Sequence, residues 1–252
     1  MNKKQLGLVV ALMPAMMVGS AQADTVFGVY FDAKYWQYDT DGNIGSGSDQ
    51  ATFDFDQEQR AILSIALEHP IPLLPNLKIR QSVQKSTGST TLTSNFTYDG
   101  RTYLAGSTIG ADLDFSHTDF TLYYEILDND VVSFDIGVSG QKYDGYATVI
   151  DQNGNRNELA FNGVIPTGYL AAQIGIPGTG FNFYGEGYLL SIDDSSLRDI
   201  DAGIEYRFIE NVAADVSLQV GYRTMKVELD DLDGLYSDIS FKGPYIGLKG
   251  HF

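Results

Sequence analysis

Apolar and polar residues alternate along most of this chain. In the segment DFTLYYEI (119–126), every second side chain is apolar or aromatic, and the same period recurs in RAILSIALE (60–68), VSFDIGVSG (132–140) and VSLQVGYR (216–223). Because successive side chains of a strand point to opposite faces, this pattern predicts strands with one apolar face. About ten are predicted, near residues 25–38, 52–68, 77–92, 107–126, 131–146, 159–176, 180–192, 198–208, 212–227 and 238–252.

The connections between the predicted strands alternate in length. The short ones are 69–76, 127–130, 177–180 and 209–211, and longer polar ones lie near 39–50, 93–106, 147–158 and 228–237. Outer-membrane barrels have short periplasmic turns and longer external loops. The sequence therefore predicts an all-β fold, a single transmembrane antiparallel up-and-down β-barrel of about ten strands, with both termini in the periplasm.

A soluble β-sandwich would also alternate apolar and polar residues. Long strands argue against it, and so do aromatic residues near the ends of the apolar faces, namely Tyr35, Phe181, Phe183, Tyr206, Phe208 and Tyr222. Aromatic girdles of this kind are typical of barrels in a membrane.

The N-terminus has the pattern of a signal peptide. Lys3 and Lys4 precede an apolar run over 6–18, and Ala21-Gln22-Ala23 matches a small-residue cleavage site. This pattern predicts a signal peptide over residues 1–23 that is removed on export, leaving an outer-membrane barrel domain over residues 24–252.

The C-terminus resembles an insertion signal. Alternation continues in register to the last residue, and Gly247, Leu248 and Phe252 match the pattern read by the barrel-insertion machinery. That machinery and periplasmic chaperones are therefore expected partners during biogenesis.

Composition excludes several function classes. The chain has 252 residues, a formal net charge of −17 and no cysteine. Without cysteine there are no disulfides, thiolate metal sites, cysteine nucleophiles or lipid-modified cysteines. Nucleic acid is not an expected partner, because phosphate binding needs clustered Lys and Arg.

Three stretches resemble a family of Gram-negative outer-membrane β-barrel proteins of unassigned biochemical function. They are LEHPIPLLPNLKIR (67–80), DFTLYYEILDNDVVSFDIGVSGQKYDG (119–145) and GYLAAQIGIPGTGFNFYGEG (168–187). The LEHPIPLLPN turn is the most distinctive, since it places three prolines in one short connection. The resemblance implies a barrel in the outer membrane and brings no catalytic residues with it.

The polar face of the predicted strands carries many charges. We expect a lumen charge network of Asp32, Lys34, Glu58, Arg60, Arg80, Glu125, Asp135, Asp201, Glu205, Arg207 and Arg223. The same alternation also assigns seven further charged residues to the inward face, namely Glu68, Lys78, Asp119, Glu186, Asp199, Asp215 and Lys249. These charges could line a hydrated, cation-preferring passage or pair and close a narrow lumen. Ten strands lie near the size at which side chains fill a barrel, which favours the closed lumen.

The remaining candidates are weaker. The acidic segments DQNGNRNE (151–158) and DDLDG (230–234) offer oxygen ligands for divalent cations, although neither has EF-hand spacing. Trp36, the sole tryptophan, is interpreted as a membrane-interface anchor. No catalytic motif, cofactor site or metal site is recognised, so we predict that the protein is not an enzyme. The remote alternative, a barrel-top hydrolase, would use His117 with Asp112 and Asp119.

The sequence therefore predicts an integral outer-membrane protein with a structural or narrow-pore, permeability role. We expect a monomer that contacts outer-membrane lipid and lipopolysaccharide and needs no cofactor. The alternative is a surface-binding protein, adhesin-like or specific for divalent cations and lipopolysaccharide, that acts through its acidic external loops.

Overall fold

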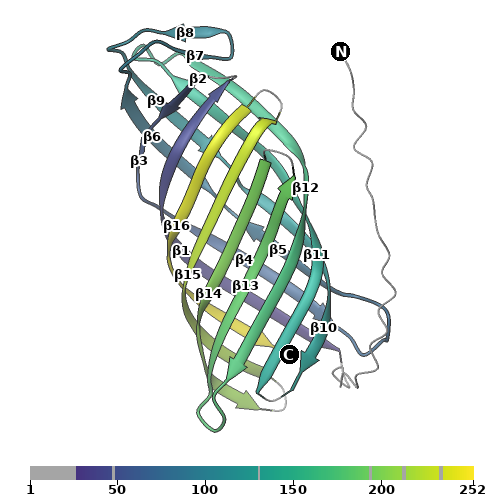
Figure 1. Ribbon diagram of the computed structural model, residues 1–252. Coiled ribbons are helices and arrows are strands. Elements are labelled where there is room, and N and C mark those ends of the chain that lie inside the picture. The colour runs from purple at the N-terminus through teal and green to yellow at the C-terminus, as the bar shows by residue number, and fades with distance from the viewer. Residues whose placement is uncertain (1–26, 47–48, 130, 193–194, 212–213, 233–234) are drawn as a thin grey trace.

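Ten antiparallel strands form a closed barrel in the computed structural model, which describes residues 27–46, 49–129, 131–192, 195–211, 214–232 and 235–252. The wall consists of β1 (Gly28–Ser46), β4 (Glu58–Glu68), β5 (Asn76–Ser82), β10 (His117–Asp128), β11 (Val132–Ile150), β12 (Arg156–Gly175), β13 (Phe181–Ile192), β14 (Ser195–Asn211), β15 (Ala214–Leu232) and β16 (Leu235–His251). Each strand pairs with the next, and β1 pairs with β16 to close the ring (Figure 1). The predicted all-β barrel of ten strands is confirmed. The predicted signal peptide, residues 1–23, lies outside the described residues.

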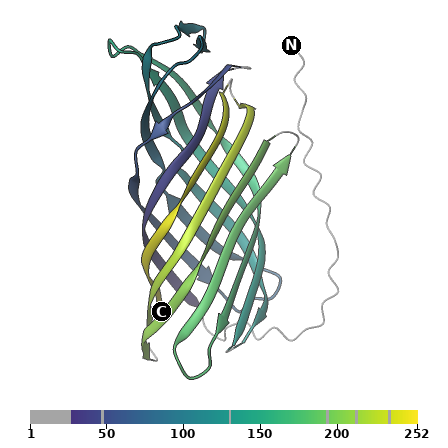
Figure 2. The same cartoon turned by 60° about the vertical axis from the view of Figure 1, so that its left-hand side comes forward.

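One end of the barrel, here called the base, holds the turns 69–75 and 176–180 and the C-terminal Phe252. The opposite end, the crown, holds the short strands β2 (Asp49–Thr52), β3 (Asp54–Phe55), β6 (Lys85–Thr91) and β9 (Thr108–Asp114), which continue the wall beyond β4, β5 and β10. A hairpin of β7 (Phe96–Tyr98) and β8 (Arg101–Tyr103) lies at the tip of the crown (Figures 1 and 2). Within the described residues, no helix is long and apolar enough to span a membrane.

The outer surface of the base half is apolar. This belt consists of exposed side chains that include Leu63, Ile65, Leu67, Phe120, Leu122, Tyr124, Phe134, Ile136, Leu170, Ile204, Tyr206, Leu218, Val220, Tyr222, Ile246 and Leu248. These are the residues that alternation assigns to the lipid-facing side, so the predicted faces are confirmed. A closed ring with an apolar exterior is the form in which strands cross a bilayer, because closure leaves no unpaired edge in the lipid.

Polarity is reversed between the two halves of the barrel, as β15 illustrates. Its outward Val220 and Tyr222 are exposed and apolar, whereas its outward Lys226 in the crown is charged. Its inward Arg223 is fully buried and charged, and Met225, the next inward residue, is fully buried and apolar. The base half thus has the polarity of a membrane barrel, and the crown has the polarity of a soluble domain.

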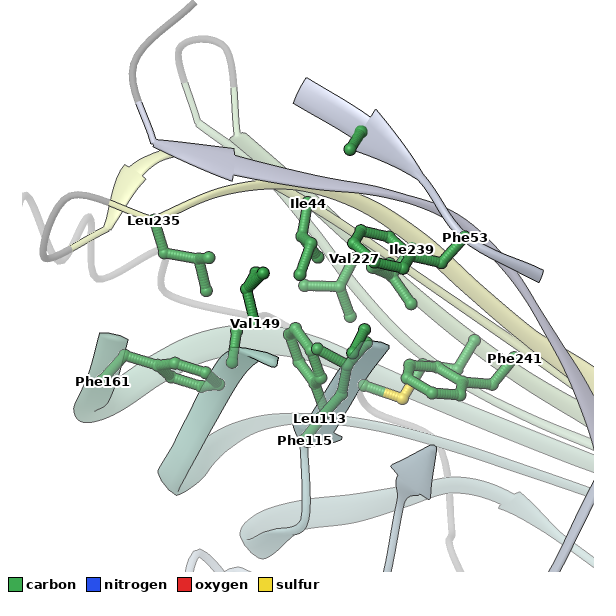
Figure 3. Close-up of a cluster of buried hydrophobic side chains, with 14 of the residues drawn as sticks. Ile44, Phe53, Leu113, Phe115, Val149, Phe161, Val227, Leu235, Ile239 and Phe241 are labelled. Carbon is green, nitrogen blue, oxygen red and sulfur yellow. The ribbon is translucent and has the colours of Figure 1, made fainter. Parts of the chain in front are cut away.

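The interior of the crown is a packed apolar core. Its buried side chains include Ile44, Phe53, Leu113, Phe115, Val149, Phe161, Val227, Leu235, Ile239 and Phe241 (Figure 3). The β7–β8 hairpin contributes Phe96, Tyr98 and Tyr103, and the Tyr98 hydroxyl donates to the Ala147 carbonyl at 2.7 Å. The hairpin therefore belongs to this core and covers its outer end.

The prediction of long polar loops near 39–50, 147–158 and 228–237 is wrong. β1 continues to Ser46, and β2 begins at Asp49. β11 continues to Ile150 and β12 begins at Arg156, while β15 continues to Leu232 and β16 begins at Leu235. The strands continue because alternate residues of these segments are apolar and join the crown core. A strand of 19 residues such as β11 is about 60 Å long at roughly 3.3 Å per residue, well beyond a bilayer.

The interpretation of Trp36 as a membrane-interface anchor is also wrong. Trp36 is fully buried in the lumen, where its indole N–H donates to the Gly243 carbonyl at 3.0 Å. It lies on the inward face of β1, directly after Lys34 on that face, at the level where the interior changes from polar to apolar. An indole suits this level because it combines a large apolar surface with one donor.

Candidate functional site in the barrel lumen

Four charged residues form buried ion pairs in the middle of the lumen. Arg80 on β5 donates from Nε to Asp119 and from Nη2 to Asp199, both at 2.5 Å. Arg223 on β15 donates from Nε and Nη2 to the two carboxylate oxygens of Asp199, at 2.7 and 2.8 Å, and from Nη1 to Ser82 Oγ at 2.7 Å. All four charged side chains are buried. We call Arg80, Asp119, Asp199 and Arg223 the charge layer.

The charge layer bridges the barrel from wall to wall. In the ring of strands, β5 and β14 stand on opposite sides, so the bond from Arg80 to Asp199 crosses the lumen. Aromatic rings lie on both guanidinium groups: Arg80 is 4.1 Å from the Tyr188 ring centroid, and Arg223 is 4.6 Å from that of Trp36. Two arginines bound to two aspartates balance the charge, and bidentate contacts reduce the cost of burying them.

A second group of ion pairs lies on the base side of this layer. Lys34 on β1 bonds to Asp201 on β14 at 2.6 Å, and the Tyr245 hydroxyl also donates to Asp201. Lys78 on β5 pairs with Glu186 on β13. These contacts again join strands that are not neighbours in the ring, so they narrow the lumen below the charge layer.

Gly247 has a steric role beside this group. It lies on the inward face of β16 opposite Lys34 on β1. A Cβ atom at this position would lie 2.9 Å from Lys34 Cγ and 3.0 Å from the Ala33 carbonyl oxygen. Glycine therefore leaves the room through which the Lys34 side chain passes toward Asp201.

The base half below the ion pairs encloses a cavity of about 880 Å³, here called the vestibule. Its walls include Asp32, Glu125, Asp135, Glu205 and Lys249. Lys249 lies 3.6 Å from Glu205, whereas Glu125 accepts a hydrogen bond from Asn76 at 3.2 Å. The vestibule is thus polar, reaches the base turns and ends at the ion pairs of Lys34 and Lys78, on the base side of the charge layer.

The expected lumen residues are divided among three places. Lys34, Arg80, Asp201 and Arg223 lie in or beside the charge layer, and Asp32, Glu125, Asp135 and Glu205 line the vestibule. Arg207 lies at the rim of the vestibule with 32% of its side chain exposed, 3.4 Å from Glu210 and 3.9 Å from Asp215. Arg60 pairs with Glu58 at 2.8 Å at the crown end of β4, away from the layer.

Two essential members of the charge layer, Asp119 and Asp199, were assigned inward by alternation but not recognised as partners of Arg80 and Arg223. The pair Arg80–Asp119 could have been predicted from the sequence, because Asp119 stands directly opposite Arg80 in the register of β10 with β5. The bond from Arg80 to Asp199 could not have been predicted, because it depends on the stagger of strands around the whole ring.

The constellation proposed for a barrel-top hydrolase does not assemble. His117 is fully buried, with its Nδ1 3.1 Å from the Phe115 carbonyl oxygen and its Nε2 3.8 Å from Asp119. Asp112 lies on the opposite, outward face of the wall and pairs with Arg156 at 2.6 Å. The wall therefore separates Asp112, on its outer surface, from the His117 ring, which is buried inside.

Several acids on the outer surface of the crown are held by bases or by backbone N–H groups. Asp41 pairs with Lys242, and Asp238 lies 3.3 Å from Lys226. In the turn after β11, the Asp151 carboxylate accepts bonds from the Asn155 side chain and the backbone N–H groups of Asn153 and Asn155. These bonds, the Asn155 side chain foremost, lower the pKa of Asp151 to about 2.

Divalent-cation binding stays a prediction. Among the described residues, no group of three or more His, Asp or Glu side chains is placed to hold a metal ion. The other candidate segment, 230–234, lies outside the residues whose side chains are described.

The C-terminal residue completes the wall. The Phe252 N–H donates to the Val29 carbonyl and the Val29 N–H donates to the Phe252 carbonyl, both at 3.0 Å. The ring of Phe252 and the side chain of Leu248 are exposed on the belt. A role of Gly247, Leu248 and Phe252 as an insertion signal stays a prediction.

Comparison with known proteins gives likenesses in structure only. No family model matches the chain, and no curated protein matches it. The transport unit of the autotransporter AIDA-I from Escherichia coli is 11% identical, with a TM-score of 0.41 over 94% of this chain and 92% of its own. The outer membrane protease OmpT from Escherichia coli is 9% identical, with a TM-score of 0.39 over 90% and 96%.

A third similar structure is the toluene transporter TodX of P. putida, which is 7% identical and has a TM-score of 0.33 over 89% of each chain. Similarity at this level says nothing about activity.

Proposed function

We propose that this protein is an integral outer-membrane barrel that is closed to solute passage and has a structural role. The belt lies in the bilayer, the base faces the periplasm and the crown stands outside the cell. The crown is then a rigid external body fixed to a membrane anchor of the same ten strands.

The observation that carries this proposal is the pair of successive barriers in the lumen. The charge layer joins opposite walls through Arg80 and Asp199. Beyond it, the interior is filled by side chains of the crown core, such as Phe115, Phe161 and Phe241, which leave little room for water. A solute that entered the vestibule would have to break buried ion pairs and then displace a packed apolar core.

The two-barrier arrangement favours closure over a narrow pore. A conducting passage needs continuous hydration or polar groups along its whole length. In the crown the interior is mostly apolar, and its few buried polar groups, such as Thr40 and Ser86, bond to each other. The acids of the vestibule therefore line a blind chamber open to one side, and their excess negative charge attracts cations without conducting them.

A swelling assay tests the proposal. Purified barrel is reconstituted into liposomes that contain an impermeant polymer, and the vesicles are diluted into an iso-osmotic solution of a small sugar such as arabinose. We expect the turbidity to stay at the level of protein-free vesicles. Sugar uptake that rises in proportion to the amount of correctly folded barrel would contradict the proposal.

A further inference from the structure

The turn between β4 and β5, residues 69–75, presents an apolar surface at the base. Leu73 is 93% exposed, and Ile71 and Leu74 are 50% and 52% exposed. The turn between β12 and β13 at the same end, by contrast, has the polar and glycine-rich sequence PGTG over 177–180. Three large apolar side chains together in a water-exposed turn would be unusual, because nothing there buries them.

The turn holds a defined shape. The backbone N–H of Ile71 donates to His69 Nδ1 at 3.3 Å, so His69 Nε2 carries the ring hydrogen and donates to the Pro75 carbonyl at 3.3 Å. The His69 N–H donates to the Asn76 side chain at 3.1 Å. Leu73 has a φ of +68°, a left-handed conformation that is uncommon for leucine. These contacts make the exposure of the leucines a built feature of the turn.

The turn bends outward, over the lipid-facing side of the wall. The hydroxyl of Tyr124, a belt residue on β10, donates to the Leu73 carbonyl at 2.9 Å. Residues 69–75 do not contribute to the walls of the vestibule. Figure 1 shows the turn as a loop that projects sideways beside β10. Its side chains thus continue the belt formed by Leu67 and Tyr124.

We propose that this turn is a lipid-binding element that inserts Ile71, Leu73 and Leu74 into the boundary between headgroups and acyl chains of the adjacent leaflet. Continuity with the belt selects lipid as the occupant, because a protein covering the turn would have to displace lipid from β10. Prolines at three of its seven positions carry no N–H, which lowers the cost of placing this backbone near hydrocarbon. The turn then fixes the depth of one side of the barrel.

The absence of cysteine from the chain permits a clean test. The variants Leu74→Cys and Thr179→Cys are labelled with a nitroxide and reconstituted into liposomes, with Leu122→Cys as a reference within the belt. Collisions of the label with oxygen, which concentrates in the bilayer, are compared with collisions with a water-soluble nickel chelate. Heat-modifiable mobility on gels shows that each labelled barrel is folded.

At Leu74 we expect oxygen accessibility between the values at Leu122 and Thr179, and accessibility to nickel well below that at Thr179. At Thr179, in the polar turn of the same end, we expect low accessibility to oxygen and high accessibility to nickel. A Leu74 label as accessible to nickel as the Thr179 label would overturn the proposal and would assign the surface to a protein partner absent from the vesicles. Equal oxygen accessibility at Leu74 and Thr179 would also overturn it, because the label at Leu74 would then lie no deeper in the bilayer than the label in the polar turn.

Discussion

Replacing Arg223 with alanine is expected to be among the most destabilising single changes in the base half of the barrel. The guanidinium makes three hydrogen bonds, two to Asp199 and one to Ser82, and lies on the Trp36 ring. Alanine removes all of these contacts. It leaves Asp199, which is fully buried, with Arg80 as its remaining charged partner.

The magnitude follows from the burial. Removal of one partner from a buried ion pair typically costs about 3–5 kcal/mol, because the other charge stays in a medium that solvates it poorly. Arg207→Ala is the matched control. Its side chain is 32% exposed and contacts acids at 3.4 and 3.9 Å, so its loss should cost less than about 1 kcal/mol.

A second variant separates charge from packing. The double change Arg223→Met with Asp199→Leu removes both buried charges and keeps apolar volume, and it should be more stable than Arg223→Ala. All variants are compared by urea titration of folding into lipid vesicles, followed by tryptophan emission and by gel mobility. If Arg223→Ala and Arg207→Ala lowered the free energy of unfolding equally, by less than 1 kcal/mol, the layer would be hydrated and the reasoning refuted.

Three further predictions concern the belt, the crown and the C-terminus. Val220→Arg places a charge in the lipid and should lower the free energy of unfolding by about 2–4 kcal/mol. Thr224→Arg, on the same face of β15 toward the crown, should change it by less than about 0.5 kcal/mol in the same titrations. Equal effects of the two variants would show that the belt ends elsewhere. Phe161→Ala should cost about 3–5 kcal/mol as a cavity in the crown core, and exposed Asn162→Ala should cost little; two small effects would contradict a packed crown. Deletion of Phe252 removes the last pair of bonds to Val29 and should reduce the heat-modifiable barrel in outer-membrane fractions, where normal amounts would contradict the role of this residue in insertion.

The base half could be predicted from the sequence because one local rule governs it. Each belt residue, such as Leu122 or Ile136, was assigned outward from its place in the alternation alone. Lipid on one side and a polar lumen on the other make that alternation strong. The same rule placed Arg80, Asp119, Asp199 and Arg223 inside, but pairing across the lumen depends on the stagger of the ring, which no short segment records.

The crown could not be predicted because its alternation keeps the same parity but exchanges the faces. On β16, outward Ile246 gives way to outward Lys242, while inward Lys249 gives way to inward Phe241. A segment with polar residues at its outward positions is interpreted as a loop if its outer face is expected to contact lipid. The signal was present in the run Val227, Leu229, Ile239 and Phe241, which alternates with charged or polar residues and marks strands in water. Trp36 was misplaced for the same reason.

Single-channel recording in planar bilayers tests the central claim of a closed lumen most directly. The folded, unmodified barrel is inserted into a solvent-free bilayer in 1 M KCl, with insertion verified by protease protection in vesicles from the same preparation. The two barriers predict no conductance steps above the protein-free baseline. Stable, cation-selective steps from the unmodified protein would contradict the closed lumen and show that the vestibule continues as a pore.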